Sequence, residues 1–202
     1  MKGIYFVTDS NLSRAGIFSD VKNALKAGVG IVQYRNKEAA TVEMIKEASK
    51  LRKICKGAKL IINDRIDIAL AVGADGVHLG QSDMPYDAAR KLLGKRRIIG
   101  LTVHNLSEAI DAERLGADYL GVAPIFSTKT KKDAGVACGP DMIRKIKKHV
   151  KIPLVAVGGI NLSNAQKVIS SGADCLCAIQ AVVTKKDVKR EIEKLQKLFQ
   201  LS

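Results

Sequence analysis

The sequence predicts a single (β/α)8 (TIM) barrel over residues 1–202, and three observations support this fold class. Eight short apolar segments, of the kind found in buried parallel strands, recur along the chain. Helix-like segments that mix charged and apolar residues separate them. The motif Gly-Ala-Asp joins a helix-like segment to the next strand at residues 73–75, 116–118 and 172–174, and Ala27-Gly28-Val29 is a weaker copy. Repeated βα units favour one closed barrel.

The predicted elements alternate regularly along the chain. The strands are expected at residues 3–9, 30–35, 59–64, 76–80, 97–103, 118–126, 153–159 and 175–183. The helices are expected near residues 18–28, 41–56, 65–73, 85–93, 106–116, 140–150, 162–172 and 187–200. Ser107-Glu108 and Asp187 suit the first residues of two of these helices. A doubly wound open sheet is the alternative, but no Gly-x-Gly-x-x-Gly motif follows the first strand.

Composition indicates a globular protein with an aliphatic core. Hydrophobic residues make up 47% of the 202 residues but aromatic residues only 4%, so Val, Ile, Leu and Ala must fill the interior. No apolar run approaches the length of a membrane span, and we expect neither a signal peptide nor a membrane partner. The cysteines Cys55, Cys138, Cys175 and Cys177 form no C-x-x-C pair, which argues against zinc and favours a reduced, cytoplasmic setting.

The formal net charge of +14 raises the question of nucleic-acid binding. The Lys and Arg residues are spread over helix-like segments such as 144–148 and 185–190, where they alternate with apolar positions. The sequence contains no zinc-finger spacing and no aromatic-rich strand that would stack bases. We therefore expect no nucleic-acid partner and a field that attracts small anionic substrates.

Polar clusters follow four of the strand-like segments, at the point where each segment ends. They are Gln33-x-Arg35-x-Lys37, Asn63-Asp64-Arg65, Asp83 and Thr128-Lys129-Thr130-Lys131. In a (β/α)8 barrel, functional side chains lie at the C-terminal ends of the strands and in the loops that follow them. Cations, amides and carboxylates together suit a diphosphate with its magnesium ion, because a metal-bridged diphosphate needs both signs of charge around it.

Each cluster also has a structural alternative. Gln33, Arg35 and Lys37 share one face of an extended segment, and a barrel strand has no solvated edge, so this face must meet the barrel mouth. Asp64 could instead pair with Arg65 or Arg35, and Asp83 could cap the following helix. Together the two acids fit Mg²⁺, which takes one or two carboxylates besides substrate oxygens and water.

Several further residues could contribute to the site. The polar segment 127–135 is either an exposed loop or a phosphate-gripping lid. Gly158-Gly159 and Ile179-Gln180-Ala181 follow the seventh and eighth strand cores and could offer backbone N–H groups to a phosphate. His104 is a candidate general base, although a lone His near a helix start is more often structural. His78 belongs to the core or lines the site.

The motifs together resemble the thiamine phosphate synthase family along essentially the whole chain. QYRNK (33–37) resembles the family's Q-x-R-x-K diphosphate motif, and residues 63–85 are similar to its most recognisable block. The segments 100–109, 116–131 and 152–160 follow in the family's order. A series of motifs in this order is far more specific than any single one.

The resemblance implies a barrel enzyme that joins a hydroxymethylpyrimidine diphosphate to a thiazole phosphate with release of diphosphate, using Mg²⁺. It implies metal ligation by Asp64 and Asp83 and electrostatic catalysis by Arg35, Lys37 and Lys131. The implied pyrimidine diphosphate ligands are Gln33, Arg35, Lys37, Asn63, Thr102 and Lys131, and the implied thiazole phosphate ligands are Thr128, Thr130 and the backbone of Gly159, Ile179 and Gln180. The same segments add Tyr34, Asn36 and Lys129 as candidate substrate ligands.

Two positions depart from the family pattern, which commonly has Ser at both. Thr102 keeps the hydroxyl, whereas Gln180 preserves the contact only if the backbone N–H makes it. The closest alternative function is a thiazole tautomerase, a relative that carries a catalytic His where this chain has Pro124. An alternative of another class is a non-catalytic sensor of a phosphate ligand. The sequence leaves the oligomeric state open, with a homo-oligomer among the options.

Overall fold

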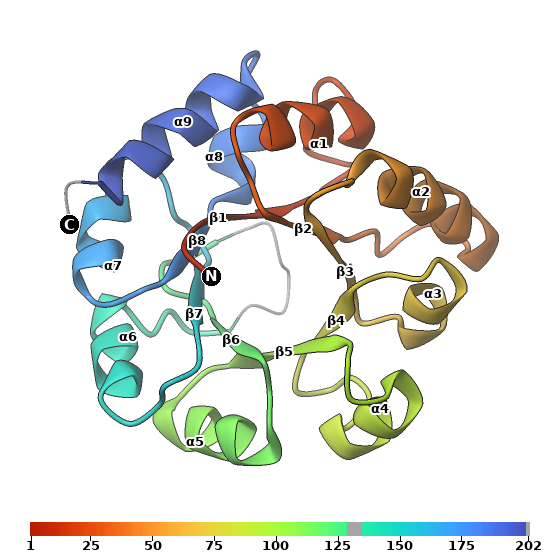
Figure 1. Ribbon diagram of the computed structural model, residues 1–202. Coiled ribbons are helices and arrows are strands. Elements are labelled where there is room, and N and C mark those ends of the chain that lie inside the picture. The colour runs from red at the N-terminus through yellow and green to blue at the C-terminus, as the bar shows by residue number, and fades with distance from the viewer. Residues whose placement is uncertain (129–134, 201–202) are drawn as a thin grey trace.

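A computed structural model, which describes residues 1–128 and 135–200, contains a closed barrel of eight parallel strands surrounded by helices (Figure 1). The strands pair in chain order, and the last strand returns to the first. They are β1 (Gly3–Val7), β2 (Ile31–Tyr34), β3 (Lys59–Asn63), β4 (Gly76–Leu79), β5 (Ile98–Val103), β6 (Tyr119–Val122), β7 (Leu154–Val157) and β8 (Cys175–Cys177). The (β/α)8 barrel predicted from the sequence is confirmed.

Helices follow every strand of the barrel in the described part of the chain. They are α1 (Ile17–Lys26), α2 (Thr41–Ile54), α3 (Ile66–Ala71), α4 (Tyr86–Leu93), α5 (Leu106–Leu115), α6 (Pro140–Lys147), α7 (Ala165–Ser170), α8 (Ile179–Val183) and α9 (Val188–Leu198). The eighth predicted strand is wrong in its second half, because β8 ends at Cys177 and the residues after it form α8. A short apolar run does not distinguish a buried strand from a buried helical turn.

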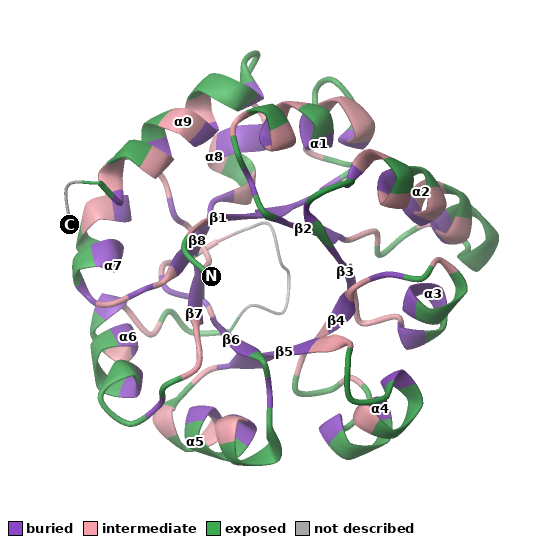
Figure 2. Ribbon diagram, in the orientation of Figure 1, coloured by how far each residue is buried: buried purple, intermediate pink, exposed green. Residues whose placement is uncertain are grey.

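The helices present their apolar faces to the barrel and their charged faces outward (Figure 2). In α9, for example, Val188, Ile192 and Leu195 are buried at helical spacing. The side chain of Asp187 accepts a hydrogen bond from the backbone N–H of Arg190 at 2.9 Å, which confirms Asp187 as the cap of this helix. None of the described helices is long and apolar enough to cross a bilayer.

Two hydrophobic clusters divide the core. The larger one lies between the barrel and the helices, and a smaller one inside the barrel contains Tyr5, Ile61, Tyr119, Val155 and Cys177. Cys175 and Cys177 are free, buried thiols on the inner face of β8. Burial raises the pKa of each to about 12, so neither is a reactive thiolate at neutral pH.

The Gly-Ala-Asp repeat builds the same hydrogen-bonded junction three times at the N-terminal ends of the strands. Each Asp accepts a hydrogen bond at its carboxylate from the backbone N–H of a residue in the preceding strand and donates its own N–H to that residue's carbonyl. We call this pair of bonds an aspartate clamp. The clamps join Asp75 to Leu60, Asp118 to Ile99 and Asp174 to Leu154, with side-chain bonds of 2.9, 2.8 and 2.8 Å and backbone bonds of 2.9 Å.

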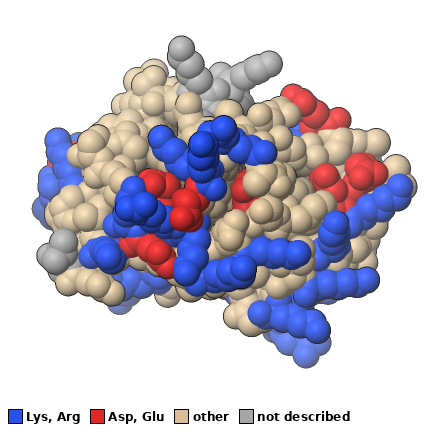
Figure 3. All heavy atoms as spheres, turned by 90° about the horizontal axis from the view of Figure 1, so that it is seen from above, with Lys and Arg blue, Asp and Glu red and all other residues tan. Residues whose placement is uncertain are grey.

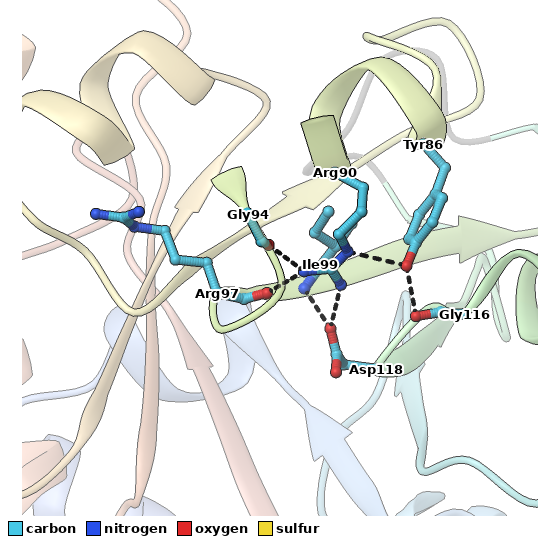
Figure 4. A network of polar contacts seen from close by, with 7 residues as sticks. All are labelled: Tyr86, Arg90, Gly94, Arg97, Ile99, Gly116 and Asp118. Atoms are coloured by element: carbon cyan, nitrogen blue, oxygen red, sulfur yellow. Dashed lines mark hydrogen bonds and ion pairs between the residues drawn. The ribbon is translucent and has the colours of Figure 1, made fainter. Parts of the chain in front are cut away.

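A cation completes each aspartate clamp, as Figure 4 shows for Asp118. Arg90 of α4 donates to the Asp118 carboxylate at 2.9 Å and to the carbonyls of Gly94 and Arg97 at 2.9 and 2.6 Å. Its Nε also donates to the Tyr86 hydroxyl at 3.1 Å. Arg52 and Lys59 pair with Asp75 in the same way, and Lys147 pairs with Asp174.

The weaker copy of the motif has a different register from the one the sequence suggested. In the β5–β6 junction, Gly100 pairs with Tyr119, and the clamp aspartate directly precedes Tyr119. In the β1–β2 junction, Tyr5 pairs with Ile31, so Gly30, which directly precedes Ile31, occupies the position of the clamp aspartate. The fourth copy is therefore Gly28-Val29-Gly30 rather than 27–29. The β1–β2 junction is built without the carboxylate that supports the other three.

Lys and Arg side chains are distributed over the helical surface. In the face shown in Figure 3 they cover much of the surface and are interspersed with small groups of Asp and Glu. Some belong to local ion pairs along one helix, such as Arg144 with Asp141 and Lys194 with Glu191. This arrangement agrees with the prediction of solvated basic helix faces.

Candidate active site

A cavity of about 700 Å³ lies at the C-terminal ends of the barrel strands, and residues of all eight strands line it. It brings together most of the site residues predicted from the sequence. These are Gln33, Arg35, Lys37, Asn63, Asp64, Asp83, Thr102, Thr128, Gly159, Ile179 and Gln180. Lys129, Thr130 and Lys131 lie outside the described residues.

Two residues of the 33–37 segment are not brought to the cavity. Tyr34 is buried between the barrel and the helices, where its hydroxyl donates to Glu47 Oε2 at 2.6 Å. The Asn36 amide donates to the same carboxylate oxygen at 3.2 Å. Side chains alternate along a strand, so Gln33 and Arg35 point inward while Tyr34 points to the helix layer. These positions do not support Tyr34 and Asn36 as substrate ligands.

Arg35 is held at the cavity wall by the end of β1. Its guanidinium lies 3.6 Å from the carboxylate of Asp9, and its backbone N–H donates to the Thr8 hydroxyl at 3.0 Å. Asp9 is buried and also accepts from the backbone N–H groups of Asn11 and Leu12, both at 3.1 Å. Asp9 therefore orients the arginine, a role that its position after an apolar strand did not reveal in the sequence.

Asp64 and Asp83 face each other at the mouth of the barrel. Burial raises the pKa of the Asp64 carboxyl and the neighbouring Asp83 carboxyl raises it further, whereas Lys37 lowers it. Lys37 contacts Asp64 directly, and Asp83 accepts from the backbone N–H of Gly80 at 2.6 Å. Two adjacent carboxylates with one cation form a site that favours further positive charge.

The backbone at Asp64 is strained. Its φ of 60° is the only positive value among the described non-glycine residues, and its N–H donates to the carbonyl of His78 at 2.8 Å. A non-glycine residue in this conformation costs free energy, and such residues concentrate at functional sites. This backbone conformation places the Asp64 side chain toward Asp83 and the cavity. Arg65 pairs with Asp67 instead.

A chain of side-chain hydrogen bonds crosses the floor of the cavity. Gln33 Nε2 donates to the Tyr5 hydroxyl at 2.9 Å, and the Tyr5 and Tyr119 hydroxyls lie 2.6 Å apart. His78 contacts the Tyr119 hydroxyl through Nδ1 at 3.0 Å and the Thr102 hydroxyl through Nε2 at 2.9 Å. Nothing in the sequence singled out Tyr5 and Tyr119, because isolated aromatic residues within apolar strands resemble ordinary core residues.

The opposite side of the cavity is formed by β7, β8 and the segments that follow them. Gly158 and Gly159 have φ values of 105° and 63°. A Cβ at Gly159 would lie 2.7 Å from the carbonyl oxygen of Ser127, so glycine permits a close approach of the two backbones. Ile179 and Gln180 lie in the first turn of α8 and line the same region.

His104 also lines the cavity, just beyond β5. Its Nδ1 donates to the carbonyl of Ala123 at 2.6 Å, and its backbone N–H donates to Glu108 at 2.7 Å. The helix start is built by Asn105, whose side chain accepts from the Glu108 N–H at 2.9 Å. These contacts give His104 a structural role at the start of α5.

The fold and this site define a (β/α)8 barrel protein with a charged site at the C-terminal mouth, and the comparisons with known proteins specify it further. Residues 4–182 match the family model described as thiamine monophosphate synthase. The thiamine-phosphate synthase of Methanosarcina barkeri is 58% identical over 188 residues, covering 93% of this chain and 86% of the relative. That of Chloroflexus aurantiacus is 49% identical over 98% of this chain and 93% of the relative. The chain belongs to the thiamine monophosphate synthase family.

Solved structures agree with this assignment. The thiamine phosphate pyrophosphorylase from Pyrococcus furiosus has a TM-score of 0.90 at 41% identity, covering 98% of this chain and 96% of that one. A thiamine phosphate pyrophosphorylase from Bacteroides thetaiotaomicron has a TM-score of 0.71 at 18% identity, which shows the shared fold alone.

Proposed function

We propose that this chain is a thiamine-phosphate synthase. It condenses 4-amino-2-methyl-5-(diphosphooxymethyl)pyrimidine with 4-methyl-5-(2-phosphooxyethyl)thiazole and forms thiamine phosphate and diphosphate. The observation that carries the proposal is the meeting of Arg35, Lys37, Asp64 and Asp83 in one cavity. This set supports a role in binding a diphosphate together with a divalent cation.

The reaction is the one that the family resemblance implies, and the charge distribution of the cavity suits it. The bond between the pyrimidine methylene carbon and the diphosphate oxygen breaks, and the diphosphate leaves with the electron pair. The thiazole nitrogen then donates its lone pair to the methylene carbon. No proton transfer is needed in either step, so the principal tasks are charge stabilisation of the leaving group and positioning of the two rings. In our proposal Arg35 and Lys37 perform the first task, with Lys131 from the segment that lies outside the described residues.

Asp64 and Asp83 would hold the magnesium ion, which would supply further positive charge against the diphosphate oxygens. The adjacent carboxylates and the raised pKa of Asp64 support this assignment, because a divalent cation relieves the repulsion between them. Among the described residues no group of three or more His, Cys, Asp and Glu gathers. Substrate oxygens and water would complete the coordination, as is usual for Mg²⁺.

The thiazole phosphate would bind on the opposite side of the cavity. We assign it to the backbone of Gly159, Ile179 and Gln180 with the hydroxyls of Thr128 and Thr130. The positive φ of Gly158 and Gly159 and the position of Ile179 and Gln180 at the start of α8 suit binding through backbone N–H groups, in which the side chain of Gln180 is not required. The proposal includes one catalytic domain over residues 1–202, acting in the cytoplasm on small molecules, with neither a nucleic-acid nor a membrane partner.

Incubation of the pure protein with both substrates and Mg²⁺ tests the proposal, with thiamine phosphate and diphosphate measured by chromatography. We expect one equivalent of each product and a strong loss of rate in the presence of a chelator. The absence of thiamine phosphate would refute the synthase assignment. Isomerisation of a thiazole substrate without C–N bond formation would instead indicate a tautomerase, and binding without turnover would indicate a sensor.

A further inference from the structure

The hydrogen-bond chain on the cavity floor connects two residues of the proposed pyrimidine diphosphate site, Gln33 and Thr102, through three others. Tyr5 and Tyr119 are each only 2% exposed, and both of their hydroxyls have side-chain partners within the barrel. Burial raises the pKa of both phenols far above the ordinary value, so each hydroxyl carries one proton to donate. The direction in which each proton points can therefore be worked out along the chain.

Gln33 sets the direction, because its Nε2 donates to the Tyr5 oxygen. The single proton of Tyr5 then points to Tyr119, its other hydrogen-bonded neighbour, since an unpaired buried hydroxyl proton is unfavourable. The proton of Tyr119 points in turn to His78 Nδ1. Nδ1 accepts this bond, and the imidazole proton resides on Nε2, which donates to the Thr102 oxygen.

The interior of the barrel is shaped to hold this chain. A Cβ at Gly100 would lie 2.0 Å from the Tyr119 ring, and a Cβ at Gly121 would lie 2.9 Å from Cε1 of His78. Glycine at both positions therefore makes room for the two rings, which stack with centroids 5.5 Å apart. The main chain of Thr102 is fixed as well, because Gln81 donates to its carbonyl at 2.6 Å.

We propose that His78 is a positioning residue which, as the neutral Nε2–H tautomer, fixes the Thr102 hydroxyl as a hydrogen-bond donor toward the cavity. The Thr102 oxygen accepts from His78, so its own proton is directed to a partner in the cavity. This inference rests on the proposed function, in which that partner is an oxygen of the departing diphosphate. Such a donor stabilises an anion that forms in the transition state.

If the hydrogen bonds between Gln33 and Thr102 ran in the opposite direction, Thr102 would not be a donor toward the cavity. If the Gln33 carbonyl accepted from Tyr5, each later proton would reverse and Thr102 would donate to His78. Thr102 would then present a lone pair to an anionic leaving group, which is repulsive. A doubly protonated His78 meets a related conflict, because Tyr119 and the Gln33 amide would then both donate to Tyr5 and leave the Tyr5 proton without an acceptor among its hydrogen-bonded neighbours.

Nitrogen-15 NMR of the unaltered protein tests the tautomer directly. The chain contains three histidines, and His78→Gln identifies the signals of His78 by their loss. We expect a pyrrole-type shift at Nε2 of His78 and a pyridine-type shift at its Nδ1. Nδ1 of His104 supplies the contrast in the same spectrum, because it donates to a carbonyl and must be pyrrole-type. A proton on Nδ1 of His78 would overturn the inference.

Two variants distinguish the contributions of the two ring nitrogens of His78 to turnover. His78→Gln places an amide N–H near the position of Nε2 and retains a donor for Thr102, whereas His78→Asn places its amide near Nδ1 and loses that donor. We expect His78→Asn to lower kcat about tenfold relative to His78→Gln, with a smaller change in KM, because the missing interaction acts on the leaving group. His149→Asn, in the exposed turn after α6, is the control and should match the unaltered protein.

A double variant identifies Thr102 as the residue through which His78 acts. Thr102→Val should lower kcat about as much as His78→Asn, and the two changes together should cost little more than either alone. Equal rates for His78→Asn and His78→Gln, or fully additive losses with Thr102→Val, would overturn the positioning role. An unaltered protein that forms no thiamine phosphate would instead refute the proposed function, while the NMR result would still test the tautomer.

Discussion

The aspartates at the two ends of the barrel are held in opposite ways. At the N-terminal ends of the strands, Asp75, Asp118 and Asp174 each accept from a backbone N–H of the preceding strand and pair with a cation. At the C-terminal mouth, Asp64 and Asp83 face each other, and among the described residues only Lys37 forms an ion pair with either of them. Within the described part of the chain, the first set is therefore better supplied with charge partners than the second.

This difference separates stability from function within one fold. The aspartate clamps satisfy backbone N–H groups that no neighbouring strand reaches, so they contribute to the free energy of folding. The pair at the mouth adds like-charge repulsion and a strained backbone at Asp64, both of which oppose folding. Features that cost stability persist where a ligand uses them, which is why the mouth is the place to expect catalysis.

Asp83→Asn should have the largest effect on turnover. The amide still accepts from the Gly80 N–H but removes one of the two proposed metal-ligating charges, and we expect kcat to fall by about 10²-fold. Thermal unfolding should change little, since the substitution also removes the repulsion with Asp64. Steady-state kinetics at saturating Mg²⁺ with calorimetric melting measures both quantities. Asp118→Asn, at the other end of the barrel, serves as the control, and unaltered turnover in Asp83→Asn would contradict the metal role.

Arg35→Ala should weaken the binding of diphosphate by about 1.5–3 kcal/mol, the scale of a hydrogen bond to a charged group. Titration calorimetry with diphosphate and Mg²⁺ measures the change. Asp9→Asn should have a smaller effect in the same direction, because it loosens the guanidinium without removing it. An Arg35→Ala protein that binds diphosphate as tightly as the original would show that the leaving group lies elsewhere.

Asp75→Ala should lower the free energy of unfolding by about 1–3 kcal/mol, because it leaves the Leu60 N–H without an acceptor and two cations without their partner. Urea denaturation measures this change. Asp75→Asn retains an acceptor oxygen and should lose less. The folded fraction of both variants should keep the original kcat. A loss of kcat in that fraction would contradict the assignment of stability to the N-terminal end of the barrel and of catalysis to the C-terminal mouth.

Gly30→Asp should add the missing fourth clamp and raise the free energy of unfolding by about 0.5–1.5 kcal/mol. Position 30 is exposed, its φ is not positive, and a Cβ there meets nothing within 4 Å. In β1, Ile4 occupies the position whose backbone N–H donates to the clamp aspartate in the other three junctions. Leu60, Ile99 and Leu154 occupy that position there. Gly30→Ala is the control, because it removes the same backbone freedom without adding an acceptor. If Gly30→Asp raises the free energy of unfolding no more than Gly30→Ala does, the aspartate forms no clamp.

The fold was largely predictable from the sequence, for a physical reason. Parallel strands buried on both faces leave continuous apolar runs. The Gly-Ala-Asp motif recurs at three junctions, where Gly adopts a positive φ, Ala is buried and Asp forms the clamp. The eighth segment was misassigned beyond Cys177 because Ile179–Val183 packs as a buried helix with the composition of a strand. The fourth motif was placed out of register because its aspartate is replaced by Gly30.

Polar residues that interrupt an apolar pattern, as Asp64 and Asp83 do, were predicted from the sequence and lie in the cavity. Tyr34 and Asn36, which belong to the same motif as Gln33 and Arg35, do not line it, because side chains alternate along the extended segment. Asp9, Tyr5 and Tyr119 were missed, since their roles depend on partners far away in the chain, such as Tyr119 with Tyr5 across 114 positions. Only the closed barrel brings such residues together.

The aspartate clamps join the second strand of each pair to the first, in β3–β4, β5–β6 and β7–β8, and never across the boundary between pairs. Among the described residues, three of the four two-strand modules, all but β1–β2, therefore have an internal seam that a clamp reinforces. Division of the gene between β4 and α4 would leave each half with its own clamps and their cations, whereas a cut between β5 and β6 would sever one clamp. Reassembly of separately produced halves should accordingly be more efficient for the first division than for the second.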